Sequence, residues 1–95
     1  MKTRRKAKTA NRLTNYMEVI TETVLGDLLA QERKGFSDVA IQDIKALALN
    51  RLWPMYTTST SGQDFLRKII EEDKIEKDVV RELKAAIDIV RSNPR

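Results

Sequence analysis

Five side chains that could contact a ligand gather around the proline in DIKALALNRLWPMY, residues 43–56. They comprise a carboxylate, an amide, a guanidinium and two aromatic rings: Asp43, Asn50, Arg51, Trp53 and Tyr56. Asp43 and Asn50 are seven residues apart, so both fall on one strip of a helix, roughly opposite its core face. Together these groups can hydrogen-bond, form ion pairs and stack, which suits a polar ligand. Two ordinary explanations stay open, because the aromatic rings could fill the core and Arg51 could cap the last carbonyls of a helix.

The basic N-terminus is a second candidate group. The chain has a formal net charge of +4, of which the first twelve residues contribute +6 and the remainder therefore −2. Clustered positive charge attracts an anionic partner such as a phosphate, a nucleotide or a nucleic acid. The candidate residues are Arg4, Arg5, Lys6, Lys8 and Arg12. The alternative is a tail that only keeps the protein in solution.

The sequence contains no cysteine and no histidine, which argues against several classes of function. Without these residues the usual nucleophiles and general bases cannot be assembled, so we do not expect an enzyme. Disulfides and thiolate metal sites are excluded as well. The acidic run Glu71-Glu72-Asp73 is more simply a solvated helix face than a metal site. We therefore expect no metal and no cofactor.

The length of 95 residues suits one small domain with a modest core. No apolar run approaches the length of a membrane span, and no apolar segment follows the basic N-terminus as it would in a signal peptide. We expect a cytoplasmic protein that does not bind membranes.

Apolar residues recur at helical spacing along most of the chain. A first helix, capped by Thr14 or Asn15, is expected to carry one apolar stripe and a second row that would bury it on two sides, as in a bundle or a dimer. A second helix is expected over residues 39–52, between a cap at Ser37 or Asp38 and a stop at Pro54. The stripe of the first helix comprises Leu13, Tyr16 or Met17, Ile20, Val24 and Leu28.

The hydroxyl-rich segment 57–62 should form a loop, in which Ser61 and Asp64 resemble a capping box. Helical stripes then cover 65–70 and 75–90, and the pattern does not distinguish one kinked helix over 64–91 from two helices. No window shows the sustained alternation typical of strands. The sequence predicts an all-α domain of three to four helices over 13–95, preceded by a basic arm over 1–12.

The stretch DIKALALNRLWPMYTTS closely resembles the signature of the late-competence protein ComFB family: an acid shortly before ALN, then a proline just before a tyrosine, then hydroxyl residues. The upstream stretch NYMEVITETVLGDLL is similar to that family's first helix, so the resemblance covers about Asn15 to Ser59. It implies a small helical fold that forms a homodimer. The chain departs from the family at Trp53-Pro54, where a Pro-Pro pair is frequent. It also lacks the cysteines that hold zinc in competence-type members, so no metal is implied.

The chain is similar to the cysteine-free branch of this family, whose members carry a basic N-terminal segment. They are described as receptors for cyclic dinucleotides, chiefly cyclic di-GMP, and are linked to cell-size or motility control. The resemblance implies a receptor that relays the cyclic di-GMP level to a partner protein. The candidate residues fit, since arginine pairs with phosphate or guanine, a carboxylate accepts from the base, and an aromatic ring stacks on it. A two-fold ligand also matches a two-fold dimer. We expect the arm to be mobile when free and to fold over the ligand.

Two other classes of function stay open. A nucleic-acid binder would use the basic arm, but the acidic remainder of the chain argues against it, and no helix concentrates basic and amide side chains on one face. A helical dimeric adaptor would bind no small ligand and would use the motif for packing, without an open concavity near Arg51 and Tyr56. The sequence does not determine which cyclic nucleotide is preferred, how many bind per dimer, or which protein responds.

Overall fold

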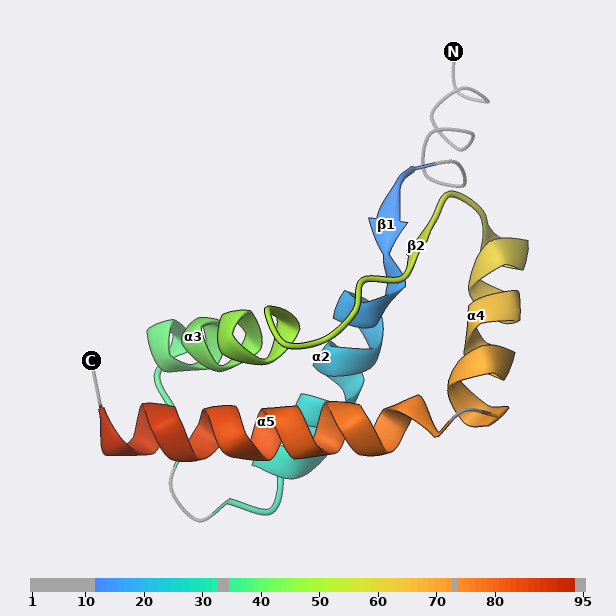
Figure 1. Ribbon diagram of the computed structural model, residues 1–95. Coiled ribbons are helices and arrows are strands. Elements are labelled where there is room, and N and C mark those ends of the chain that lie inside the picture. Colours follow the sequence, from blue (N-terminus) through green and yellow to red (C-terminus); the bar gives the residue numbers. More distant parts are fainter. Residues whose placement is uncertain (1–11, 33–34, 73, 94–95) are drawn as a thin grey trace.

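The computed structural model describes residues 12–32, 35–72 and 74–93. Within these ranges the chain forms four helices and two very short strands (Figure 1). The prediction of a small all-α domain with three to four helices is confirmed. None of the described helices combines the length and apolarity that crossing a bilayer requires. In chain order the elements are β1 (Thr14–Asn15), α2 (Tyr16–Leu29), α3 (Asp38–Leu49), β2 (Tyr56–Thr57), α4 (Thr60–Glu72) and α5 (Ile75–Ser92).

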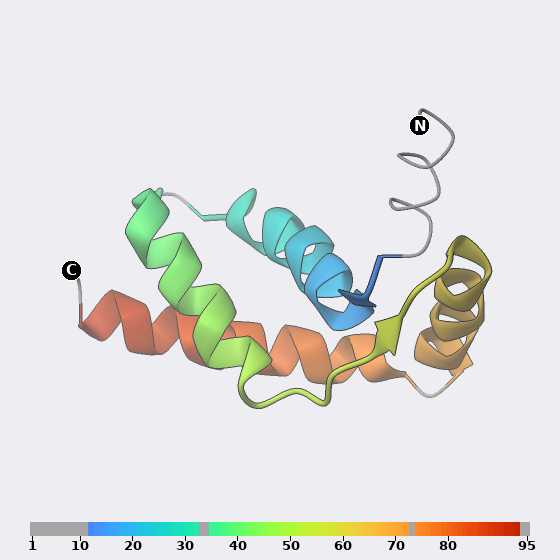
Figure 2. The ribbon, with the colours of Figure 1, turned by 90° about the horizontal axis from the view of Figure 1, so that it is seen from above.

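Helix α5, with 18 residues, lies below α3 in the view of Figure 1 and contributes one face to the core. Seen from above, α2 and α3 lie across it while α4 stands at the end of the molecule, beside the first turns of α5 (Figure 2). The apolar residues of α5 recur every three or four positions, so they form one buried stripe, as the sequence predicted. The buried residues of that stripe are Val79, Leu83, Ala86, Ile87 and Val90.

The first two helices contribute most of the remaining core residues, among them Val24 and Leu25 of α2 and Ile44 and Ala48 of α3. Leu13, which the sequence placed at the start of the first stripe, is exposed. This expectation was wrong because the helix begins only at Tyr16. Leu13 precedes β1, so its side chain does not belong to the apolar stripe of the helix.

Asn15 fastens the segment after Pro54 to the start of α2. Its Oδ1 atom caps the helix by accepting a hydrogen bond from the Met17 amide at 3.1 Å. The same oxygen accepts from the Met55 amide at 2.8 Å, and the Tyr16 amide donates to the Met55 carbonyl at 2.6 Å. Antiparallel pairing of β1 with β2, which sets Asn15 opposite Tyr56, continues this contact. The sequence did not indicate the strand pair, because two residues are too few to alternate.

Helix α3 ends three residues earlier than predicted, at Leu49. The turn that follows α3 is narrower than an α-helical turn. In it the Arg51 amide donates to the Ala48 carbonyl at 3.0 Å and the Leu52 amide donates to the Leu49 carbonyl at 3.3 Å. These bonds reach back three residues instead of four, and Pro54 prevents any continuation. At the other end Ser37 caps the helix, as the sequence allowed, by accepting from the Ala40 amide at 3.1 Å.

Helix α4 begins at Thr60, so the predicted capping box at Ser61 is wrong. The cap is Ser59, whose Oγ atom accepts from the Gly62 amide at 3.0 Å. A side chain at Gly62 would clash with Oγ1 of Thr57, which explains the glycine in this turn. At its far end α4 is separate from α5, since Lys74 adopts the left-handed conformation with φ 57°. The segment 64–91 is therefore two helices and not one kinked helix.

Replacing Thr21 with valine should stabilise the fold. Thr21 is only 1% exposed within α2, and its Oγ1 atom has no hydrogen-bond partner among the described residues. Because an unpaired buried hydroxyl is costly and valine has nearly the same shape, we expect Thr21→Val to raise the free energy of unfolding by about 1 kcal/mol. Urea denaturation followed by circular dichroism measures this. The exposed Thr23→Val serves as the control, with a change below about 0.5 kcal/mol. A less stable Thr21→Val variant would contradict an unpaired hydroxyl.

Removing the Asn15 side-chain oxygen should destabilise the protein more than the loss of an ordinary cap. Asn15→Ala deprives both Met17 and Met55 of their acceptor, so we expect a loss of about 2 kcal/mol, roughly half from each bond. Asn15→Asp keeps an acceptor at the helix N-terminus and should stay within about 0.5 kcal/mol of the parent. Urea denaturation again measures the difference. If alanine and aspartate proved equally stable, the double role of Asn15 would be refuted.

Candidate ligand-binding site

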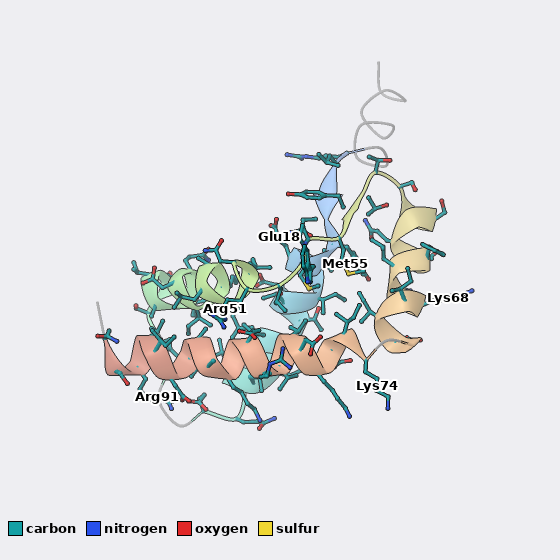
Figure 3. The ribbon with its side chains drawn as sticks, viewed as in Figure 1. Glu18, Arg51, Met55, Lys68, Lys74 and Arg91 are labelled. Carbon is teal, nitrogen blue, oxygen red and sulfur yellow. The ribbon has the colours of Figure 1, made fainter. Side chains whose placement is uncertain are left out.

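An open hollow of about 410 Å³ lies where the chain leaves α3 and crosses to β2. Because Met55 is bonded to the first turn of α2, this segment bridges from α3 to α2 (Figure 3). Both the crossing segment and helix α5 contribute to the walls. The lining residues are Met17, Arg51, Leu52, Trp53, Pro54, Met55, Ile75, Asp78 and Arg81.

Two arginines on the wall of this hollow share one carboxylate. Arg51 Nε donates to Glu82 Oε1 at 2.9 Å, and Arg81 Nε lies 3.4 Å from Glu82 Oε2. Arg81 also donates from Nη1 to Asp78 Oδ1 at 2.9 Å. The pKa of Arg81 is raised, first by its hydrogen bond to Asp78 and then by the charge of that carboxylate. Arg51 thus makes a long-range ion pair, and the interpretation of it as a side-chain cap of α3 is wrong.

The two aromatic residues of the motif lie on the surface. Trp53 is 87% exposed and Tyr56 is 60% exposed, so neither fills the core. Trp53 lines the hollow beside Arg51, whereas Tyr56 lies on β2 next to Asn15. An exposed indole beside a guanidinium offers a flat surface on which a planar ring can stack.

Asp43 and Asn50 line a different hollow, of about 350 Å³, between α3 and the C-terminal half of α5. The seven-residue spacing does bring them together, but at the edge of the face that packs on α5, with Ile89 beside them, and not opposite the core face. A third hollow, of about 480 Å³, is lined by Asn50 and Arg51 together with α5 residues. The structure therefore arranges Asp43, Asn50, Arg51 and Trp53 along one face.

The predicted residues Arg4, Arg5, Lys6 and Lys8 lie outside the described residues. Arg12 is exposed and immediately precedes the segment that enters β1, the partner of the strand that carries Tyr56.

Asp78, Arg81 and Glu82 were not predicted from the sequence. The spacing of Asp78 and Arg81 could have indicated their helical ion pair. No local pattern connects Glu82 with Arg51, which lies 31 residues away.

Comparisons with known proteins agree with this fold. The family described as "Late competence development protein ComFB" matches residues 14–94. The solved structure of the late competence protein ComFB from Bacillus subtilis is similar with a TM-score of 0.78 and 20% sequence identity, over 87% of this chain and 92% of that chain. This likeness shows the fold, and no curated protein matches the chain significantly. Because the family match spans nearly the whole sequence, the chain belongs to the ComFB family.

Proposed function

We propose that this protein is a receptor for a cyclic dinucleotide, with cyclic di-GMP as the expected ligand, and that it acts as a homodimer that signals to a partner protein. The supporting observation is the open hollow at Arg51 and Trp53. Both side chains are exposed in the single chain, so neither is used for packing in the core of this domain. The resemblance to the cysteine-free members of the family supports the same ligand.

Arg51 and Trp53 supply complementary interactions for such a ligand. Within the described part of the chain, the ion pair of Arg51 runs through Nε, so its two terminal amino groups lie outside this bond. A pair of amino groups suits two phosphate oxygens or the O6 and N7 atoms of guanine. The indole of Trp53 supplies the stacking surface, and Asn50 and Asp43 further along the face supply polar groups for base edges.

The charges around Arg51 give the N-terminal arm a role. Arg51, Arg81, Glu82 and Asp78 are formally neutral as a group. The two phosphates of a cyclic dinucleotide need further positive charge, because an anion that leaves water must be compensated. We propose that the basic residues of the arm supply it: Arg4, Arg5, Lys6, Lys8 and Arg12.

Titration calorimetry tests the proposal directly. Cyclic di-GMP at physiological salt should give saturable heat that GMP cannot reproduce, cyclic di-AMP measures the base preference, and the stoichiometry places the ligand within or across the dimer. The chain has one tryptophan, so the fluorescence of Trp53 should change together with the heat. Absence of heat, with an unshifted melting temperature, would refute the receptor and favour the adaptor.

Arg51→Ala should weaken binding about tenfold or more, because a hydrogen bond to a charged group is worth about 1.5–3 kcal/mol. Lys84→Ala is a matched control: it removes one positive charge from an exposed position on α5 that lines none of the three hollows described above. It should change the affinity less than about twofold. Calorimetry compares both variants with the parent, and an unchanged affinity of Arg51→Ala would remove this residue from the site.

Alanine substitutions in the arm separate ligand binding from folding. Arg4→Ala, Arg5→Ala and Arg12→Ala should each lower the affinity for cyclic di-GMP by about threefold to tenfold. The melting temperature without ligand should stay within about 1 °C, because we propose that the arm serves ligand binding and not the folded core. Calorimetry and thermal denaturation give the two quantities. Three variants with parental affinity would mean that the arm is only a tail.

A further inference from the structure

The carboxylate of Glu82 occupies an unusual place between the two arginines. Its side chain is only 12% exposed, the least of all the side chains in the ion pairs recorded among the described residues. One oxygen accepts from Arg51 and the other faces Arg81, at 2.9 and 3.4 Å. It also lines the third hollow, beside Leu47 and Ile89. A carboxylate with so little contact with water needs hydrogen bonds and opposite charges around it, and the two guanidiniums lie where they can supply both.

Within residues 12–32, 35–72 and 74–93, the side chain of Arg51 forms both its hydrogen bond and its ion pair with Glu82. Arg51 follows Asn50, the C-terminal cap of α3, and its side chain is 73% exposed. A free arginine side chain samples many rotamers, and ordering it upon ligand binding costs conformational entropy. The bond from Nε to Glu82 removes part of this freedom before any ligand arrives.

We infer that Glu82 is a positioning residue of the proposed site: it holds Arg51 through Nε and so presents the two terminal amino groups of Arg51 to a phosphate or a guanine edge. This inference rests on the proposed function. The opposite role would be competition, in which Glu82 occupies Arg51 and an anionic ligand must displace it. Competition would require the carboxylate to cover the terminal amino groups, whereas the observed bond uses Nε.

The two roles predict opposite signs for Glu82→Gln. Loss of a negative charge close to an anionic ligand should by itself strengthen binding. Glutamine keeps one acceptor oxygen but loses the charge that attracts both guanidiniums, so its bond to Arg51 is weaker. If Glu82 positions Arg51, the substitution weakens binding instead, and we expect a loss of about fivefold to tenfold for cyclic di-GMP in calorimetry. Asp88→Asn is the matched control, because it removes one negative charge from an exposed position on the same helix. It should change the affinity less than about twofold. Unchanged or tighter binding by Glu82→Gln would overturn the inference.

A double-mutant cycle separates positioning from a general effect on the fold. If Glu82 acts through Arg51, then Glu82→Gln should change the affinity less than about twofold when Arg51 is already alanine. An equal loss in both backgrounds would contradict the inference. Arg51→Lys provides an independent check, since lysine cannot bond Glu82 and still present a pair of amino groups. It should lose about as much affinity as Arg51→Ala, so lysine with parental affinity would also overturn the role of Glu82.

The parent protein distinguishes failure of the inference from failure of the proposed function. If the parent does not bind cyclic di-GMP, both are refuted. If the parent binds and Glu82→Gln binds equally well, the receptor stands and only the positioning role is lost. Circular dichroism of each variant verifies that the helices are retained at the temperature of the titration.

Discussion

The hydrogen bonds accepted by Asn15 are the constraint on which the candidate site depends. One side-chain oxygen caps α2 and at the same time holds Met55, a residue 40 positions away in the sequence. These bonds, with the short strand pair beside them, determine where the segment after α3 crosses the molecule. Pro54 ends the helix but does not specify a direction, and these bonds help to specify it.

Ion pairs of the crossing segment with α5 and within α5 then determine the charge distribution at the candidate site. The crossing segment places Arg51 and Trp53 at the surface. Helix α5 contributes Glu82, Arg81 and Asp78 beside them. An exposed tryptophan contributes little to the stability of the core. A nearly buried carboxylate needs partners of opposite charge. This combination of an exposed ring and a nearly buried, paired carboxylate supports the proposed binding site.

The sequence predicted the fold well where apolar residues at regular helical spacing indicate which face of a helix is buried. The stripe of α5, the cap at Ser37 and the stop at Pro54 follow from local rules, and the motif around Arg51 was sufficient to recognise the ComFB family. The failures lie at helix ends. Leu13 matches the apolar spacing but precedes the helix, and α3 tightens before its predicted end, because hydrogen bonds at a terminus depend on neighbours that periodicity does not contain.

The sequence by itself determined which residue types are available: no histidine or cysteine, a basic N-terminus, and a cluster of polar and aromatic residues at a helix end. Only the tertiary structure decided their surroundings. It separated Asp43 from Trp53 into different hollows, brought Trp53 to the surface, and joined Arg51 to Glu82 across 31 residues. The physical reason is that burial and ion pairing depend on how helices pack against one another, and no pattern within a single helix encodes that arrangement.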